Sequence, residues 1–241
     1  YSYMEDSFRL KGLQYLENYN GYCYSQLPRK YKTRIEETQM AVNILDSKCH
    51  ELVKFDVFRR VNTGGVPLNP QEIRNSMATP DTRSLLKQMS ESEEFIKATR
   101  GRVKDIRMDA QELCLRFIAF WMRYDSHSGQ LSHLMALTRM LDRTLLELNQ
   151  KKKDYHLLLC ALFKNSMEKC HALFGEEAFS KEDLNLIINR PLFVSWSVVM
   201  ATCTLDMETL QSRRNDAIEL QHKYFGGGEY YNAITSSTAT K

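Results

Sequence analysis

The chain lacks the features that mark secreted and membrane proteins. It contains no Asn-x-Ser/Thr glycosylation sequon and no signal peptide, and its six cysteines form no Cys-x-x-Cys pair. The most apolar run, residues 192–205, is too short and too rich in Ser and Thr to span a bilayer. We therefore expect a cytoplasmic protein with no membrane partner, in which free cysteines act as small hydrophobic residues.

A strong charge of one sign is also missing. The 241 residues carry a net charge of +3, with 43% hydrophobic and 26% charged residues. This balance is typical of a globular chain with a real core, and it permits a local basic patch without requiring nucleic acid over the whole surface. Because the chain begins with Tyr1 rather than Met, we expect a fragment or a processed product.

Recognisable catalytic and metal-binding motifs are absent too. The pairs Cys49-His50 and Cys170-His171 are adjacent in sequence, so on a helix their side chains point in different directions and rarely share one ion. No His-Glu-x-x-His helix and no Gly-x-Ser-x-Gly elbow occurs, and the two Ser-x-x-Lys matches lack their companion motifs. The sequence therefore identifies no metal site and no catalytic residue.

Apolar periodicity predicts a mainly α (α+β) fold. Helical spacing recurs at 8–19, 51–61 and many places after 80, and helices are expected to begin after Pro28, Asn69 and Ser180 and at Asp109. Further stripes run through 131–148, 155–163, 193–203 and 210–224. Only residues 40–45 alternate as a strand does, and a lone strand cannot satisfy its backbone. Either partner strands precede Tyr1, or this strand assignment is wrong.

The segment 58–75, FRRVNTGGVPLNPQEIRN, gathers two arginines, an amide, a hydroxyl and two glycines at a helix end: Arg59, Arg60, Asn62, Thr63, Gly64 and Gly65. Arginines bind phosphate in a bidentate manner, glycines let a ligand approach the backbone, and a following helix N-terminus presents N–H groups. The alternative is a capped corner between two helices, with Asn69, Pro70 and Glu72 as the cap. The residues alone support both interpretations equally.

A basic stretch is a second candidate for phosphate contact, this time from nucleic acid. It contains Arg100, Arg102, Lys104 and Arg107 around Gly101. A charge run of this kind is more often a solvated surface than a binding site, so a solvated surface is the preferred interpretation.

The segment 58–75 closely resembles the second signature of the GmrSD-type restriction endonuclease family, in its N-terminal domain of ParB/sulfiredoxin-like fold. The flanks FRLKGLQYLENYNGYCYSQLP (8–28), MAVNILD (40–46) and YYNAITSSTATK (230–241) resemble the family less specifically. The resemblance implies binding and hydrolysis of a nucleoside triphosphate with Mg²⁺ in DNA-directed phage defence, often on modified DNA. It also implies a partner nuclease domain or subunit.

Residue by residue, the resemblance implies a nucleotide site lined by Arg59, Arg60, Asn62 and Thr63 and shaped by Gly64 and Gly65. Three further residues would lie near the same cleft, namely Glu72, Arg74 and Asn75, with Glu72 acting mainly as a helix cap. The family's leading Asp-Gly-Gln-Gln-Arg motif and any His/Asn/His nuclease site are absent from the chain. We therefore expect the chain to be inactive alone, whatever the whole protein does.

Three domains follow from this reading. Residues 1–80 would be the C-terminal part of a ParB-like nucleotide- and DNA-binding domain, a remnant with one or few strands. Residues 81–225 would form a helical bundle, and 226–241 a flexible tail. The alternative function is a non-catalytic helical module that binds DNA or a partner protein, and a third interpretation is a structural scaffold without a ligand.

Overall fold

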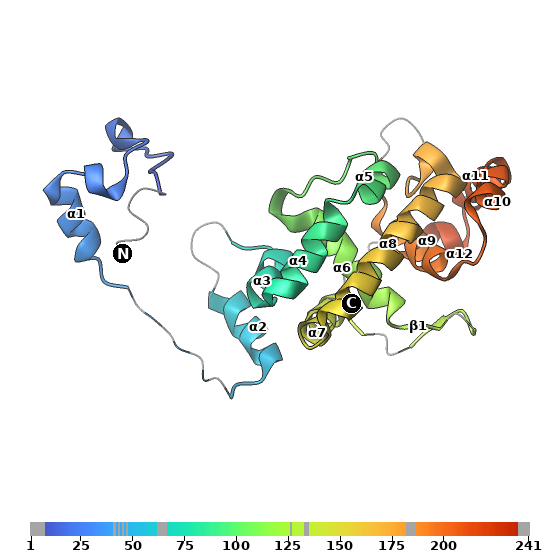
Figure 1. Cartoon of the computed structure of the whole chain (residues 1–241), viewed down its shortest axis with the longest axis horizontal. Coiled ribbons are helices and arrows are strands. Elements are labelled where there is room, and N and C mark those ends of the chain that lie inside the picture. The colour runs from blue at the N-terminus through green and yellow to red at the C-terminus, as the bar shows by residue number, and fades with distance from the viewer. Residues whose placement is uncertain are drawn as a thin grey trace. The chain divides into compact units, whose positions relative to one another are not determined.

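The computed structural model divides the chain into two units, Tyr1–Ser47 and Lys48–Lys241 (Figure 1). It describes residues 8–40, 42, 44, 46, 48–61, 67–125, 127–132, 135–181 and 187–235. Helices dominate the second unit and are the main regular structure overall among the described residues, so the mainly α class predicted from the sequence is confirmed. The ParB/sulfiredoxin-like remnant stays a prediction.

The first unit contains two short 3₁₀ turns, η1 (Glu17–Tyr19) and η2 (Tyr24–Gln26), and one helix, α1 (Arg29–Glu36). The helix expected after Pro28 is therefore confirmed. The helix predicted over 8–19 is wrong, because only η1 forms there. Instead the Leu10 N–H donates to the Tyr22 carbonyl at 3.0 Å, and Gly21 donates to Leu10 at 2.8 Å. Gly21 takes a φ of 86°, which lets the segment turn back on itself.

The strand expected over 40–45 finds no support among its described residues. Met40, Val42 and Ile44 lie in neither a helix nor a strand, and 74–89% of each residue is exposed. The intervening positions 41, 43 and 45 lie outside the described residues. The strands that the structure does describe are elsewhere, β1 (Tyr124–Asp125) and β2 (Gln130–Leu131), which form an antiparallel pair.

The described helices of the first half of the second unit begin in part at side-chain caps. They are α2 (Glu51–Val61), α3 (Pro70–Met77), α4 (Pro80–Ser90), α5 (Glu93–Thr99), η3 (Ile106–Met108) and α6 (Asp109–Trp121). Asn69, Thr79 and Ser92 each accept a hydrogen bond from a backbone N–H in the first turn that follows. The starts predicted at 51, 70 and 109 are thus confirmed.

The second half continues with α7 (Leu137–Asn149), α8 (Lys153–Phe174), η4 (Gly175–Glu177), α9 (Arg190–Thr202), α10 (Met207–Ser212), α11 (Arg214–Phe225) and α12 (Glu229–Thr235). Leu131 was expected in the helix that became α7, but it lies in β2. The helix expected after Ser180 falls mostly on 182–186, outside the described residues. None of the described helices has both the length and the apolar character needed to cross a membrane.

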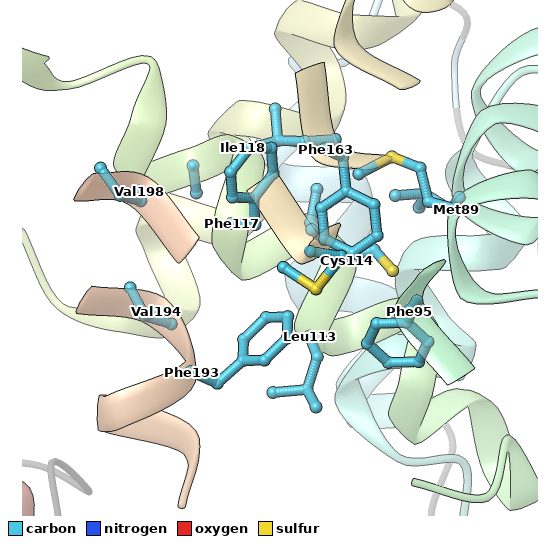
Figure 2. Packing of buried hydrophobic residues seen from close by; sticks show 14 of the residues in the cluster. Met89, Phe95, Leu113, Cys114, Phe117, Ile118, Phe163, Phe193, Val194 and Val198 are labelled. Atoms are coloured by element: carbon cyan, nitrogen blue, oxygen red, sulfur yellow. The ribbon is translucent and has the colours of Figure 1, made fainter. Parts of the chain in front are cut away.

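The core of the second unit forms around α6 and α8. Helix α8 packs against α4, α5 and α9, and α6 packs against α4, α7 and α9 (Figure 1). Phe163 of α8 lies at the centre of an aromatic group, with ring centroids 5.8 Å from Phe95, 5.0 Å from Phe117 and 6.5 Å from Phe193. Figure 2 shows these rings converging from four helices together with Met89.

Two predicted boundaries differ from the observed arrangement. The sequence placed a domain boundary at 80, but Ile73 of α3 and Leu85 of α4 belong to one continuous core. The expected flexible tail 226–241 contains helix α12, whose Ile234 packs with Leu192 and Phe225 in a second, smaller apolar cluster. Burial of this residue explains why the segment folds back as a helix.

We expect Phe163→Ala to lower the free energy of unfolding by about 3–5 kcal/mol, because a fully buried ring is lost and its neighbours relax only partly. Urea denaturation followed by circular dichroism measures this change. Leu158→Ala on the same helix, at a side chain with 58% of its surface exposed, is the matched control and should change stability by less than about 0.5 kcal/mol. Equal effects of the two substitutions would contradict this packing.

Candidate functional site

The candidate site begins at the C-terminal end of α2, where Arg59 and Arg60 occupy the last turn. Cations are favourable there because helix carbonyls point toward them. Phe55, one turn earlier, is fully buried and anchors the helix on the core. The positions that follow Val61 in the predicted site, Asn62, Thr63, Gly64 and Gly65, lie outside the described residues. Their part in a phosphate loop stays a prediction.

Arg59 is engaged in an ion pair with a distant residue. Its Nη2 lies 2.5 Å from Oδ2 of Asp142 on α7, and its Nη1 lies 3.4 Å from Oδ1 of Asp56. Asp142 is 3% exposed, so this carboxylate is buried, whereas Asp56 is on the surface. A buried carboxylate needs such partners, since desolvation of an unpaired charge is very unfavourable.

Arg74 of α3 binds the same carboxylate from the other side. Its Nε donates to Oδ1 of Asp142 at 2.8 Å, and its Nη2 donates to the Thr138 carbonyl at 3.4 Å. Only 1% of Arg74 is exposed; burial lowers the pKa of its guanidinium, and the charge of Asp142 opposes that effect. The side chain predicted to reach a ligand cleft therefore points into the core and joins α3 to α7.

Arg60 differs from its neighbour. It is exposed, and its side chain has no hydrogen-bond or ion-pair partner among the residues that the structure describes. Two adjacent arginines thus have separate environments, since Arg59 is neutralised by Asp142 and Arg60 is exposed to solvent.

The N-terminus of α3 is closed by its own side chains. Asn69 Oδ1 accepts from the Glu72 N–H at 2.8 Å, and Glu72 Oε2 accepts from the Asn69 N–H at 2.6 Å. This reciprocal cap was predicted and is confirmed, so the Glu72 N–H is not available to a phosphate. The hydrogen bond from Arg107, followed by that from Asn69, lowers the pKa of the Glu72 carboxyl.

A strained segment holds this cap in place. Arg107 and Met108 take φ values of 62° and 65°, a conformation that is unfavourable for side chains with a Cβ. Arg107 binds Glu72 at 2.7 Å and the Pro67 carbonyl at 2.6 Å, and its own carbonyl accepts from Asn69 at 2.7 Å. These contacts fix the second half of the 58–75 segment against η3.

The basic stretch is therefore only partly available for nucleic acid. Arg107 is occupied as described, and Arg100 donates to the Glu176 carbonyl and, at 2.7 Å, to Ser180 Oγ. Partial burial lowers the pKa of Arg100. Arg102 and Lys104 are exposed, and contact of these two with nucleic acid stays a prediction.

Sequence reasoning missed a second ionic cluster next to the first. Arg74 Nη1 lies 3.9 Å from Glu112 of α6, Arg116 Nη2 lies 2.6 Å from it, and Arg190 Nη1 of α9 lies 3.3 Å from it. The sequence does contain a sign of Asp142, the carboxylate of the first cluster, because this acidic residue interrupts the apolar stripe of Leu141 and Leu145. Nothing in the neighbouring sequence indicates which arginines pair with Asp142.

Asn75 is the remaining residue of the predicted site, and three acidic residues lie in the same corner. Asn75 is half-buried at the end of α3, where its carbonyl accepts from Arg83 at 3.4 Å. The three carboxylates of this corner, Asp56, Glu72 and Asp142, are all paired with arginines. Among the described residues, no three metal-ligating side chains cluster together. Mg²⁺ in nucleotide sites usually takes only one or two carboxylates, so a Mg²⁺ ion bound together with a nucleotide stays a prediction.

Comparison with known proteins identifies no relative. No protein-family model matches the chain, and no curated protein and no solved structure matches it. The resemblance of 58–75 to the GmrSD-type signature therefore rests on the residues of that segment alone.

We expect Asp142→Asn to lower the free energy of unfolding by about 3–5 kcal/mol, because it leaves buried Arg74 without its charged partner. Asp56→Asn is the matched control, since it removes the other carboxylate that contacts Arg59, at a side chain with 66% exposure. Its effect should stay below about 1 kcal/mol. Chemical denaturation measures both, and a harmless Asp142→Asn would show that the buried pair is dispensable.

Proposed function

We propose that the corner around residues 58–66 binds the phosphates of a nucleotide, as part of a DNA-directed defence protein of GmrSD type. The resemblance of the segment 58–75 supports this proposal. The proposal covers binding alone, because the family's Asp-Gly-Gln-Gln-Arg motif is absent from the chain.

One observation carries the proposal, namely the different environments of the two adjacent arginines. Asp142 and Asp56 neutralise Arg59, while Arg60 is exposed and unpaired among the described residues. A corner that serves only as a structural scaffold needs a neutralised arginine such as Arg59, but it does not need an exposed one such as Arg60. An exposed guanidinium that precedes two glycines in the sequence is suited to bind a phosphate, because its planar donors match two phosphate oxygens.

The cap formed by Asn69 and Glu72 at the start of α3 limits which groups can donate hydrogen bonds to a phosphate. Since Asn69 and Glu72 satisfy each other, phosphate recognition would depend on Arg60 and on the residues of the glycine segment rather than on the end of α3. Arg59 then acts as a positioning residue, because its ion pair with Asp142 holds the last turn of α2 against α7.

We expect Arg60→Gln to weaken binding of a fluorescent ATP analogue about tenfold, or roughly 1.4 kcal/mol, without changing the melting temperature. The neighbouring variant Arg59→Gln should instead lower the melting temperature, because Asp142 loses one of its two arginines. Arg213→Gln, at an exposed residue of the α10–α11 junction, is the charge-matched control. Titration by fluorescence anisotropy and thermal melting together distinguish the roles. Unchanged affinity in Arg60→Gln would overturn the proposal.

The DNA-directed part of the proposal depends on Arg102 and Lys104, the exposed members of the basic stretch. If both contact phosphates, Arg102→Gln combined with Lys104→Gln should reduce the slope of log K against log salt by about 2 on duplex DNA. Lys151→Gln combined with Lys152→Gln removes the same charge from the exposed turn before α8 and is the control. Equal slopes for the two double variants would show that residues 100–107 make no specific contribution.

A further inference from the structure

An apolar cavity of about 340 Å³ is a feature that the proposed nucleotide corner does not use. It lies among α6, α7, α9 and the β1–β2 hairpin, which contribute Phe120, Leu137, Val194, Val198 and Leu131 to its wall. A volume of this order is at the lower end of the range for small-molecule sites. The cavity therefore suits a small ligand with a hydrocarbon body.

One end of this cavity is basic. Arg116 lies one helical turn before Phe120 on α6, and Arg190 lies one turn before Val194 on α9. Both guanidinium groups reach the same carboxylate oxygen, Oε1 of Glu112, at 2.6 Å and 3.3 Å. The two arginines are thus at one end of the cavity, and the apolar side chains extend away from them along both helices.

The charges at the basic end are not balanced by Glu112. Two guanidinium groups of the cavity, those of Arg116 and Arg190, contact this one carboxylate, whereas Arg74, 3.9 Å from its Oε2, is already paired with Asp142. The only other carboxylate that contacts Arg190 among the described residues is Asp109, at 3.4 Å and with 52% of its side chain exposed. An exposed partner is screened by water, so the basic end retains the capacity to bind one more anionic group.

The residues that line the cavity determine which kind of chemical group can carry the anionic group of a ligand. Ser195 lines it, but its hydroxyl donates to the carbonyls of Pro191 and Leu192 in its own helix. A ligand with many polar atoms, such as a nucleobase, would leave those atoms without partners among the valines and leucines, which is unfavourable. An aliphatic chain has no polar atoms that need hydrogen-bond partners, so its burial in the cavity is favourable.

We propose that this cavity is a binding site for a single-chain aliphatic carboxylate. The hydrocarbon chain lies between Phe120 of α6 and Val194 and Val198 of α9, and the carboxylate accepts hydrogen bonds from Arg116 and Arg190. The inference is independent of the nucleotide corner, because it rests on residues that the corner does not use.

Titration with decanoate and 1-decanol, below the concentrations at which they aggregate, tests the proposal by calorimetry. The two probes share a chain and differ in charge. Decanoate should bind at least tenfold more tightly than 1-decanol. Arg190→Gln should lower decanoate affinity about tenfold and leave 1-decanol unchanged, because it removes one guanidinium at a half-exposed position. Arg213→Gln is the control and should bind both probes as the natural chain does.

Methyl NMR locates the bound probe. Decanoate should shift the methyl signals of Val194 and Val198 and leave those of the core residues Leu159 and Leu173 in place. Absence of decanoate binding, an unchanged preference for decanoate in Arg190→Gln, or shifts confined to residues outside the cavity would each overturn the proposal. A melting curve for Arg190→Gln confirms that the variant is folded when the comparison is made.

Discussion

The buried ion pair between Arg74 and Asp142 is the constraint on which the arrangement of the second unit depends. Two charges in a protein interior lose their hydration, and their attraction compensates for this only when the geometry is good and the remaining atoms are satisfied. Both oxygens of Asp142 are bound, one by Arg74 and the other by Arg59. Helices α2, α3 and α7 must therefore pack in the one arrangement that brings these three side chains together.

This constraint fixes the two helices that precede and follow residues 62–66 in the sequence, α2 and α3. Arg59 precedes residues 62–66 and Arg74 follows them, and both side chains end on a single carboxylate. The second tether is Arg107, whose contacts with Glu72 and the Pro67 carbonyl fix the chain just before α3. A binding loop gains affinity when its ends are held in advance, because less conformational entropy is lost when the ligand arrives.

Local chemistry made much of the fold predictable, and the rest depended on contacts between distant residues. The cap formed by Asn69 and Glu72 involves residues three apart, so the start of α3 can be read from the sequence. The helix predicted over 8–19 is wrong because a contact between more distant residues replaces the local pattern. Leu10, Leu13 and Leu16 have helical spacing, but the Leu10 N–H donates to the Tyr22 carbonyl instead. Arg59 and Asp142 are 83 positions apart, and periodicity carries no information about such a pair.

The candidate site shows the same division. The sequence predicted that the segment containing Arg59, Arg60 and Arg74 forms a site, but it could not assign these arginines to different environments. Burial decides that assignment, and burial depends on α7, which is remote in the chain. Arg74, which was expected to lie near the same cleft, proves to be 1% exposed. Arg60, which has no distinguishing feature in the sequence, is the one left facing solvent.

The two ionic clusters share a single electrostatic origin, because Arg74 contacts both Asp142 and Glu112. Four guanidinium groups, those of Arg59, Arg74, Arg116 and Arg190, face these two largely buried carboxylates. The remaining carboxylates, Asp56 and Asp109, are more than half exposed, and water and salt weaken their contribution. These two carboxylates are therefore outnumbered by the guanidinium groups that contact them, and the proposals of an anion at the glycine corner and of an anion in the apolar cavity both depend on this excess of positive groups.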